Sequence, residues 1–443
     1  MAPRTLHLTA AVALVLLLTG CDTFDTLFVA KEEKLPGERI AILATDRGLQ
    51  PDPQIADQQV RLAEPYTNAD WTQAGGSPAH VMYHLALSET PRRAWTADVG
   101  DGSGDDRQLL AQPIVVGNVV YTMDSVSLIS AFDATSGRLL WRHDLQPEDE
   151  DAGYFGGGIA YDNGRIFVST GFARVFALDA KTGEVQWQTA VGAPIRGAPT
   201  ATEGRVFAVT LDNQTVALSA DDGSILWTHS GLQEDAGLIG GASPAVSGST
   251  VVAPYSSGEI FGLLAENGRV LWSDSLSAVT QVDPLGDIAQ IRGAPVIDRG
   301  LVIAVSHAGR MIAIDLRQGV RAWEAEVGGT EMPWVGGDYV FVLTNDAQLV
   351  CLTRREGRVR WVLALPRYEN PDRQEGPIDW AGPVLASDRL ILAGSNGQAL
   401  SVSPYTGEVL GAIDLPGSVR IAPVVAGGSL YFVTDEGTLV AYR

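Results

Sequence analysis

A recurring motif of one glycine and one tryptophan constrains this chain more than any other feature. Residues 131–141 and 177–187 share the frame Ala-x-Asp-x-x-x-Gly-x-x-x-Trp. Further copies, with the same spacing from glycine to tryptophan, end at Trp227, Trp272, Trp323 and Trp361. Successive tryptophans of the series from Trp141 are separated by 38 to 51 residues. A period of this size is typical of a β-propeller, in which each repeat forms one blade.

Each repeat has the pattern of four short antiparallel strands. In the fifth repeat, the expected strands cover residues 293–297, 301–305, 310–315 and 320–327. The motif glycine supplies the positive φ angle that the turn before the fourth strand demands. We interpret the repeated tryptophans as packing between neighbouring sheets rather than as a cage around a ligand.

The two ends of the repeat array determine the expected number of blades. A seventh copy of the motif, around Gly407, has Leu410 where tryptophan is expected. The last stretch, residues 421–441, supplies three strands, and residues 92–99 resemble an isolated fourth strand. Pairing these two segments would close the ring and leave no open sheet edge. The sequence therefore predicts an all-β fold, an eight-bladed propeller of four-stranded antiparallel blades closed by an N-terminal strand.

The N-terminal residues have the pattern of an export signal. Residues 8–18 form an apolar run that is too short to span a bilayer comfortably. The run leads into Cys21 in a sequence that resembles the lipobox of bacterial lipoproteins, although an ordinary secretory signal is the alternative. We expect a signal peptide at 1–20, a lipidated tether and leader at 21–90, and the propeller at 91–443.

The overall charge and the cysteine content exclude several classes of protein. The chain of 443 residues has a formal net charge of −22, which disfavours binding to a nucleic-acid backbone. Its 2 cysteines can supply neither a disulfide framework nor a thiolate metal site. We expect no bound metal ion and no nucleic-acid partner.

A search for catalytic and ligand-binding patterns finds only weak candidates. Residues 101–106 are rich in aspartate, but Gln112 stands where a calcium-binding loop would need glutamate. His80 and His84 are four residues apart without the glutamate of a zinc protease motif. Residues 71–76 and His80 are instead expected to pack the leader against the propeller. No arrangement of residues in the sequence predicts a catalytic site.

The repeat frame resembles that of quinoprotein alcohol dehydrogenases and their relatives. Together with the lipobox and the compact eight-blade array, it is similar to the BamB family of lipoprotein subunits in the outer-membrane β-barrel assembly machinery. The resemblance implies a non-enzymatic scaffold without a cofactor. Such a scaffold binds the periplasmic domains of the barrel-forming subunit and assists nascent outer-membrane proteins. It is anchored by its lipid in the outer membrane, although Asp22 leaves retention at the inner membrane open.

Two other functions remain as alternatives. The first is a periplasmic quinoprotein dehydrogenase, a class that typically carries a vicinal cysteine pair, a calcium ion and a catalytic aspartate. After lipidation of Cys21, the remaining Cys351 cannot form such a pair and is expected to be a small buried residue. The second alternative is a propeller that binds peptidoglycan or another component of the cell envelope.

The family resemblance also places the contacts with the partner. Ile195 and Arg196 match an apolar-arginine pair at the entrance of one blade, a composition expected of an interface hot spot. At a later blade the family has acids, whereas this chain has Gln290 and Arg292. Either the nearest acids, Asp283 and Asp287, substitute for them, or the partner surface has changed sign locally. Long loops at 146–156, 277–290 and 366–378 are further candidate contact regions.

Overall fold

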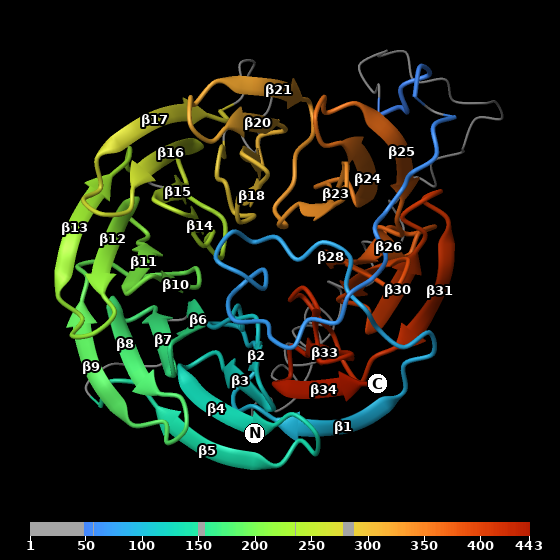
Figure 1. The fold of residues 1–443 in the computed structure, drawn as a ribbon. Coiled ribbons are helices and arrows are strands. Elements are labelled where there is room, and N and C mark those ends of the chain that lie inside the picture. The colour runs from blue at the N-terminus through green and yellow to red at the C-terminus, as the bar shows by residue number, and fades with distance from the viewer. Residues whose placement is uncertain (1–47, 56, 149–155, 235, 278–287) are drawn as a thin grey trace, which may run out of the picture. The chain divides into compact units, whose positions relative to one another are not determined.

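The propeller predicted from the repeats is confirmed (Figure 1). The computed structural model describes residues 48–55, 57–148, 156–234, 236–277 and 288–443. Residues Leu49–Arg443 form one compact unit, in which eight four-stranded antiparallel sheets stand as blades around a central axis. The expected signal peptide, Cys21 and Asp22 lie outside the described residues. Because the described part contains no helix, it also contains no helix that could cross a membrane.

The blades follow one another in chain order, each running from an inner strand to an outer strand. Blade 1 consists of β2 (Ile114–Val116), β3 (Val119–Met123), β4 (Leu128–Asp133) and β5 (Leu139–Asp144), and blade 2 of β6 (Gly157–Asp162), β7 (Arg165–Thr170), β8 (Arg174–Asp179) and β9 (Val185–Ala190). Blade 3 consists of β10 (Thr200–Thr202), β11 (Arg205–Val209), β12 (Gln214–Ser219) and β13 (Ile225–Ser230), and blade 4 of β14 (Ala245–Ser247), β15 (Thr250–Pro254), β16 (Glu259–Leu264) and β17 (Val270–Ser275).

Blade 5 consists of β18 (Val296–Asp298), β19 (Leu301–Val305), β20 (Met311–Asp315) and β21 (Arg321–Ala325). Blade 6 consists of β22 (Trp334–Gly336), β23 (Tyr339–Leu343), β24 (Gln348–Thr353) and β25 (Val359–Ala364). Blade 7 consists of β28 (Trp380–Ala386), β29 (Arg389–Gly394), β30 (Gln398–Val402) and β31 (Val409–Asp414). A separate hairpin of β26 (Tyr368–Asn370) and β27 (Glu375–Pro377) lies within the third predicted long loop.

Blade 8 joins the two ends of the propeller sequence, as predicted. It combines β32 (Val424–Ala426), β33 (Ser429–Val433) and β34 (Thr438–Tyr442) with β1 (Arg93–Asp98). The strands β1 and β34 are antiparallel, with Trp95 opposite Ala441. In the other blades a covalent turn joins the third and fourth strands. Here two backbone hydrogen bonds between Arg92 and Arg443, of 2.7 and 2.9 Å, take its place.

The repeated tryptophans pack between blades, which confirms their predicted role. The Trp141 indole of blade 1 donates a hydrogen bond of 3.2 Å to the Ala180 carbonyl of blade 2. A Cβ atom added at Gly183, whose φ is +75°, would lie only 2.5 Å from the Trp141 ring. The glycine therefore serves both the turn and the close approach of the preceding blade's tryptophan. Equivalent indole hydrogen bonds are made by Trp95, Trp187, Trp227, Trp272, Trp323 and Trp361.

The strand register corrects one detail of the predicted repeat. In blade 2, Trp187 lies opposite Ala177, whereas in blade 7 Gly411 lies opposite Ser401. Gly411, and not Leu410, therefore occupies the tryptophan position. The alignment was one residue off because the seventh repeat has lost the large side chain that marks its frame.

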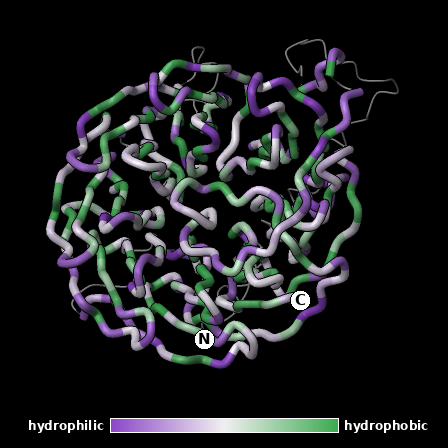
Figure 2. The backbone as a smooth tube through the Cα atoms, viewed as in Figure 1, coloured by the Kyte–Doolittle hydropathy of each residue, from purple (hydrophilic) through white to green (hydrophobic). Residues whose placement is uncertain are grey.

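Apolar residues fill the space between the sheets. Figure 2 shows hydrophobic stretches along the strands and hydrophilic residues at many of the turns. The middle strands β8, β24 and β34 are mostly buried, whereas the outer strand β31 is almost entirely exposed. The burial of the inner and middle strands on both faces holds each blade against its two neighbours.

The leader crosses the axis of the ring and bonds to the inner strand of every blade. In Figure 1 it is the blue segment that runs through the centre of the ring. From Asn68 to Leu85 its contacts follow the blades in order around the ring. They reach Val425, Val115, Tyr161, Ala201, Val246, Ile297, Trp334 and Leu385.

Two buried side chains anchor this leader, as predicted for residues 71–76 and His80. Trp71 has no exposed surface and stacks on Trp334, with ring centroids 6.1 Å apart. His80 is also buried, and its Nδ1 donates to the Pro295 carbonyl over 2.7 Å. Burial lowers the pKa of His80 to about 4, so the imidazole is neutral in the folded protein near pH 7.

Candidate functional site

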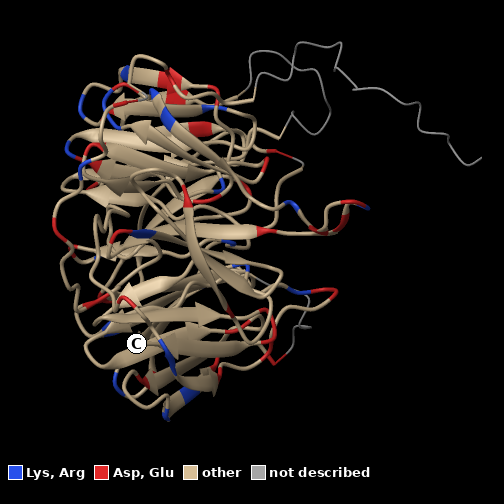
Figure 3. Cartoon of the chain, turned by 90° about the vertical axis from the view of Figure 1, so that its right-hand side faces the viewer, with Lys and Arg blue, Asp and Glu red and all other residues tan. Residues whose placement is uncertain are grey.

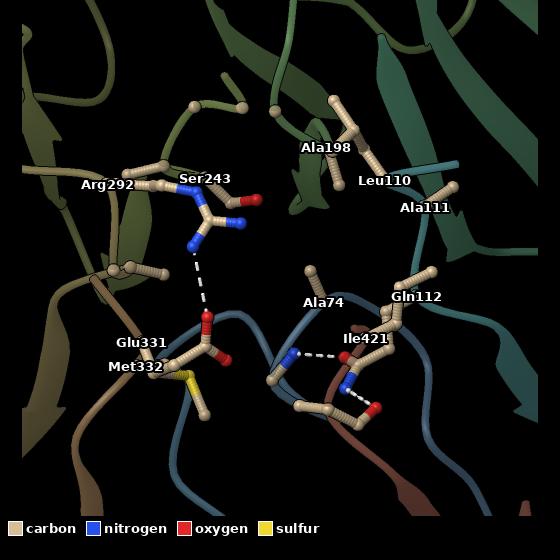
Figure 4. A pocket seen from close by; sticks show the side chains of 18 of the residues that line it. Ala74, Leu110, Ala111, Gln112, Ala198, Ser243, Arg292, Glu331, Met332 and Ile421 are labelled. Carbon is tan, nitrogen blue, oxygen red and sulfur yellow. Dashed lines mark hydrogen bonds and ion pairs between the residues drawn. The ribbon is translucent and has the colours of Figure 1, made fainter. Parts of the chain in front are cut away.

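An axial cavity of about 160 Å³ opens at the end of the ring opposite the leader. Trp71, Ala74 and Gly75 of the leader form its floor, and the segments that precede the inner strands form its wall (Figure 4). The amide of Gln112 receives the Gly75 N–H over 2.9 Å and donates to the Ala422 carbonyl over 3.1 Å. The leader and two blades are therefore joined at the base of the cavity.

Two charged groups of the cavity, Arg292 and Glu331, neutralise each other. Arg292 forms an ion pair of 3.0 Å with Glu331 and donates from Nε to the Ile239 carbonyl over 2.9 Å. The second Glu331 oxygen accepts the Gly382 N–H over 3.3 Å. The carboxylate is thus occupied by groups of the protein itself.

Arg420, from the segment before β32, lines the same cavity. It pairs with Asp379 at 3.0 Å and with Asp435, and Ser418 completes the cluster. These contacts cross from blade 7 to blade 8. Arg292 and Arg420 therefore hold neighbouring blades together.

The residues of this cavity do not fit a quinone cofactor with its calcium ion. The single carboxylate and the Gln112 amide described above are already bound by protein groups. Cys351, the candidate for a cysteine pair, is fully buried in β24, and burial raises the pKa of its thiol. Among the described residues, no group of three or more histidine, cysteine or acidic side chains could hold a metal ion.

The weaker sequence candidates also have partners of their own. His80 binds the Pro295 carbonyl, whereas His84 binds the Ala63 carbonyl over 2.6 Å through Nδ1. The other His84 nitrogen accepts the Asp388 N–H over 2.9 Å. The two imidazoles therefore do not converge on one ligand. In the acidic loop, Asp101 forms an ion pair of 3.1 Å with Arg107.

The predicted partner-binding residues fall into three groups. Arg196 and Arg292 line the axial cavity together, so the structure brings the two predicted loops to one place. Ile195 and Gln290 are buried, with exposed fractions of 0% and 4%. Asp283 and Asp287 lie outside the described residues.

The loop from Gly231 to Ala242 connects these predicted residues. The Gln290 amide donates to the Gly240 carbonyl over 3.1 Å and accepts the Leu238 N–H over 2.5 Å. Arg196 and Gln290 also line a small groove beside the cavity, next to Leu211. Gln290 therefore fixes the position of the loop rather than offering a free side chain.

This loop carries apolar residues that sequence reasoning missed. Leu232 is 64% exposed and Ile239 is 51% exposed, and the neighbouring Leu211 is 43% exposed. We call these three residues, together with Arg196, the loop patch. In the sequence, an exposed leucine or isoleucine in a loop looks the same as a buried one. No local signal therefore marks Leu211, Leu232 and Ile239 as exposed. The loops that carry Leu211 and Leu232 adjoin, because the Asn213 amide donates to the Leu232 carbonyl, and exposed apolar side chains on adjoining loops are candidates for a binding surface.

The fold defines a class of protein, the closed β-propeller built from tryptophan-bearing repeats. Within this class, a family model described as outer membrane protein assembly factor BamB matches residues 125–363 and 370–443. The chain belongs to this family.

Seen edge-on, the propeller carries most of its charged residues in loops and turns, and loops with acidic residues project from one side (Figure 3).

Curated relatives agree with the family model. The outer membrane protein assembly factor BamB of Yersinia pestis is 26% identical over 360 residues, which cover 80% of this chain and 89% of the relative. The protein of the same name from Escherichia coli K12 is 26% identical over 357 residues, covering 79% and 88%. An uncharacterized protein of Rickettsia prowazekii is also 26% identical, over 346 residues, covering 74% and 81%.

Solved structures share the fold. The crystal structure of BamB from Moraxella catarrhalis superposes with a TM-score of 0.67 at 17% identity, covering 80% of this chain and all (100%) of the other. A quinohemoprotein alcohol dehydrogenase from Comamonas testosteroni gives a TM-score of 0.65 at 16% identity, covering 88% and 83%. At these identities the likeness concerns the fold alone, so the site has to be judged from its residues.

Proposed function

We propose that this protein is a non-enzymatic scaffold in the assembly of outer-membrane proteins. Membership of the BamB family supports this role, and the observation that carries it here is the loop patch. In the axial cavity, Arg292 and Arg420 are already paired with acidic residues of the protein. The loop patch, in contrast, offers apolar surface beside the cation Arg196. The proposed partner is the periplasmic part of the barrel-forming subunit.

The loop patch has the composition that such an interface needs. Leu232 and Ile239 supply apolar area whose burial releases water, and Arg196 supplies directional hydrogen bonds at the edge of that area. Ile195 contributes to the contact indirectly, because its buried side chain supports the backbone on which Arg196 stands. Gln290 and Arg292 act in the same way on the neighbouring loop.

Other parts of the proposal rest on the family and on the N-terminal sequence. We propose that Asp283 and Asp287 add polar contacts to the same partner. Cleavage after residue 20 would allow lipidation of Cys21, which would hold the propeller in the periplasm at the outer membrane. Asp22 makes the inner membrane the alternative location. Nascent outer-membrane proteins are a further proposed partner.

The test is co-purification of the barrel-forming subunit with variants of the loop patch. Replacing Arg196 with glutamate and Ile239 with aspartate (Arg196→Glu, Ile239→Asp) should reduce recovery of the subunit at least about 10-fold, because a charge would be buried in the contact. Leu271→Ser, at a 39% exposed position on the outer strand of blade 4, is the matched control and should leave recovery unchanged.

A separate measurement guards against misfolding. The unfolding of the double variant is followed in urea beside that of the single variant Ile239→Asp, which should stay within about 0.5 kcal/mol of the parent because Ile239 is 51% exposed. Ile195→Ala, in contrast, should cost about 2–5 kcal/mol because the isoleucine is fully buried. Full recovery of the barrel-forming subunit with a folded double variant would refute the loop patch as its binding site.

A further inference from the structure

A cavity separate from the loop patch lies between blades 7 and 8, the one junction of the described blades that has no tryptophan. In blade 6 a cross-strand row places Trp361 beside Cys351 and Phe341, and the two rings lie 5.9 Å apart. The corresponding row of blade 7 is Gly411, Ser401 and Ile391. All three residues of this row line a cavity of about 420 Å³. The cavity therefore lies where the other junctions hold an indole ring.

The walls of this cavity are mostly apolar. Leu87, Ala399, Ile413 and Leu430 line it along with Ile391. A Cβ atom added at Gly411 would meet no other atom within 4 Å, so the entrance above this strand is open. We call this space the seam cavity.

The closure of the ring explains why no side chain of blade 7 fills the seam cavity. At the neighbouring junction, Trp361 donates to the Pro404 carbonyl, which lies in the turn between the last two strands of blade 7. Blade 8 has no such turn, because β34 and β1 are joined only by hydrogen bonds. Residues 87–92, which lead into β1, form the wall at this position instead.

The charges around the seam cavity favour an anionic group in the occupant. Arg389 donates to the carbonyls of Glu89 and Ser88 over 2.8 and 2.6 Å, but its buried Nε–H has no acceptor within the described residues. Glu89 and Asp388 are near, yet neither forms an ion pair with this guanidinium. Arg92, which is exposed, lies on the same wall. Two arginines and one acidic residue, Glu89, therefore line the cavity, and a carboxylate in the occupant would complement the excess positive charge.

We propose that the seam cavity binds an aromatic side chain of a partner polypeptide that carries a carboxylate beside that side chain. The aromatic ring would take the place that indoles fill at the other junctions. The carboxylate would face Arg389 and Arg92. Because β31 belongs to blade 7, whereas the loop patch belongs to the segments of blades 3 and 4 on the other side of the ring (Figure 1), this surface is separate from the loop patch and does not depend on the proposed function.

Labelled peptides test the proposal on the unaltered protein. The probe is a fluorescein-labelled hexapeptide with tryptophan followed by aspartate in a glycine-serine background, measured by fluorescence anisotropy. Replacing its tryptophan with serine should weaken binding at least about 10-fold, because the apolar burial is lost. Replacing its aspartate with asparagine should weaken binding about 5-fold, because only the charge is lost.

Two variants locate the binding. Gly411→Trp would fill the cavity with the side chain that the repeat has at this position, and should weaken binding of the tryptophan-aspartate peptide at least about 10-fold. Leu271→Trp adds the same side chain to the outer strand of blade 4 and should have no effect. Arg389→Gln should remove the difference between the aspartate and asparagine peptides, an effect that a general loss of stability would not produce.

The outcomes are decisive in both directions. Absence of binding to the parent protein, or equal binding to Gly411→Trp, would overturn the proposal. A concentration-dependent dimer that Gly411→Trp abolishes would also overturn it, because a second copy of this chain would then be the occupant. Folding of each variant is checked by circular dichroism, and the comparison of peptides on the parent protein needs no variant.

Discussion

The two ends of the ring axis are built from the same inner strands but differ in how they are closed. At one end the leader from Asn68 to Leu85 bonds to all eight inner strands and buries Trp71. At the other end the segments before the inner strands surround an open cavity, and the loop that carries the exposed Leu232 and Ile239 reaches this cavity at Gly240. The difference separates two tasks. One end holds the blades in place, so that loops at the other end are free to carry surface that contributes little to folding.

The largest effect is expected at the closed end. Trp71→Ala should lower the free energy of unfolding by about 3–5 kcal/mol, because the ring stacked on Trp334 is fully buried and its loss leaves a cavity. Urea unfolding followed by circular dichroism measures this change. Trp71→Phe keeps a ring against Trp334 and should cost clearly less. A loss below about 1 kcal/mol for the alanine variant would show that the leader is not an integral part of the ring.

A pH-dependent effect should also originate at the closed end. The pKa of His80 falls from 6.5 to about 4 in the folded protein because the imidazole is buried. The unfolded chain therefore binds a proton more readily. This histidine's contribution to stability is complete above pH 6.5 and is lost as the pH falls from 6.5 to about 4. The loss amounts to about 3 kcal/mol.

His80→Asn tests this pH dependence by removing the titrating group. Asparagine suits the backbone at this position, where φ is +57°. Urea unfolding at several pH values should show a smaller loss of stability between pH 6.5 and 4 in this variant than in the parent. His143→Asn, on the outer strand β5, makes the same substitution away from the leader and is measured beside it as the control. Identical profiles for the parent and His80→Asn would contradict the burial of a neutral imidazole.

The smallest effect is expected at the open end. Leu232→Ser should change the free energy of unfolding by less than about 0.5 kcal/mol, because the leucine is 64% exposed. The same urea titration applies. A loss of more than about 1 kcal/mol would mean that the loop patch takes part in the packing of the propeller, and the contrast between the two ends would disappear.

The repeats made most of the fold predictable from sequence. The strand at 301–305 was expected at the bounds that β19 has, and the pairing of β1 with β34 followed from counting strands at the two ends. The error at Leu410 arose where the repeat lost its tryptophan. Periodicity is therefore informative only while the residues that mark it remain.

The path of the leader and the loop patch could be predicted only in part. Trp71 and His80 were expected to pack the leader against the ring, and both are buried there. The order in which the leader reaches the blades depends on pairings between residues up to 357 positions apart. The exposure of Leu232 depends on how two loops meet around Gln290, and no short stretch of sequence encodes it.

The contacts of the leader also determine how this ring would respond to a mechanical load. Among the described residues, a pull from the N-terminal side first reaches Asp52, which bonds to blade 6 through Arg358 and the Val359 carbonyl. The next load-bearing segment runs across all eight inner strands before the chain enters β1. Force would therefore spread over many hydrogen bonds in shear before it could peel β1 from β34. The seam that closes the ring without a covalent turn is in this way shielded from the end of the chain that leads into it.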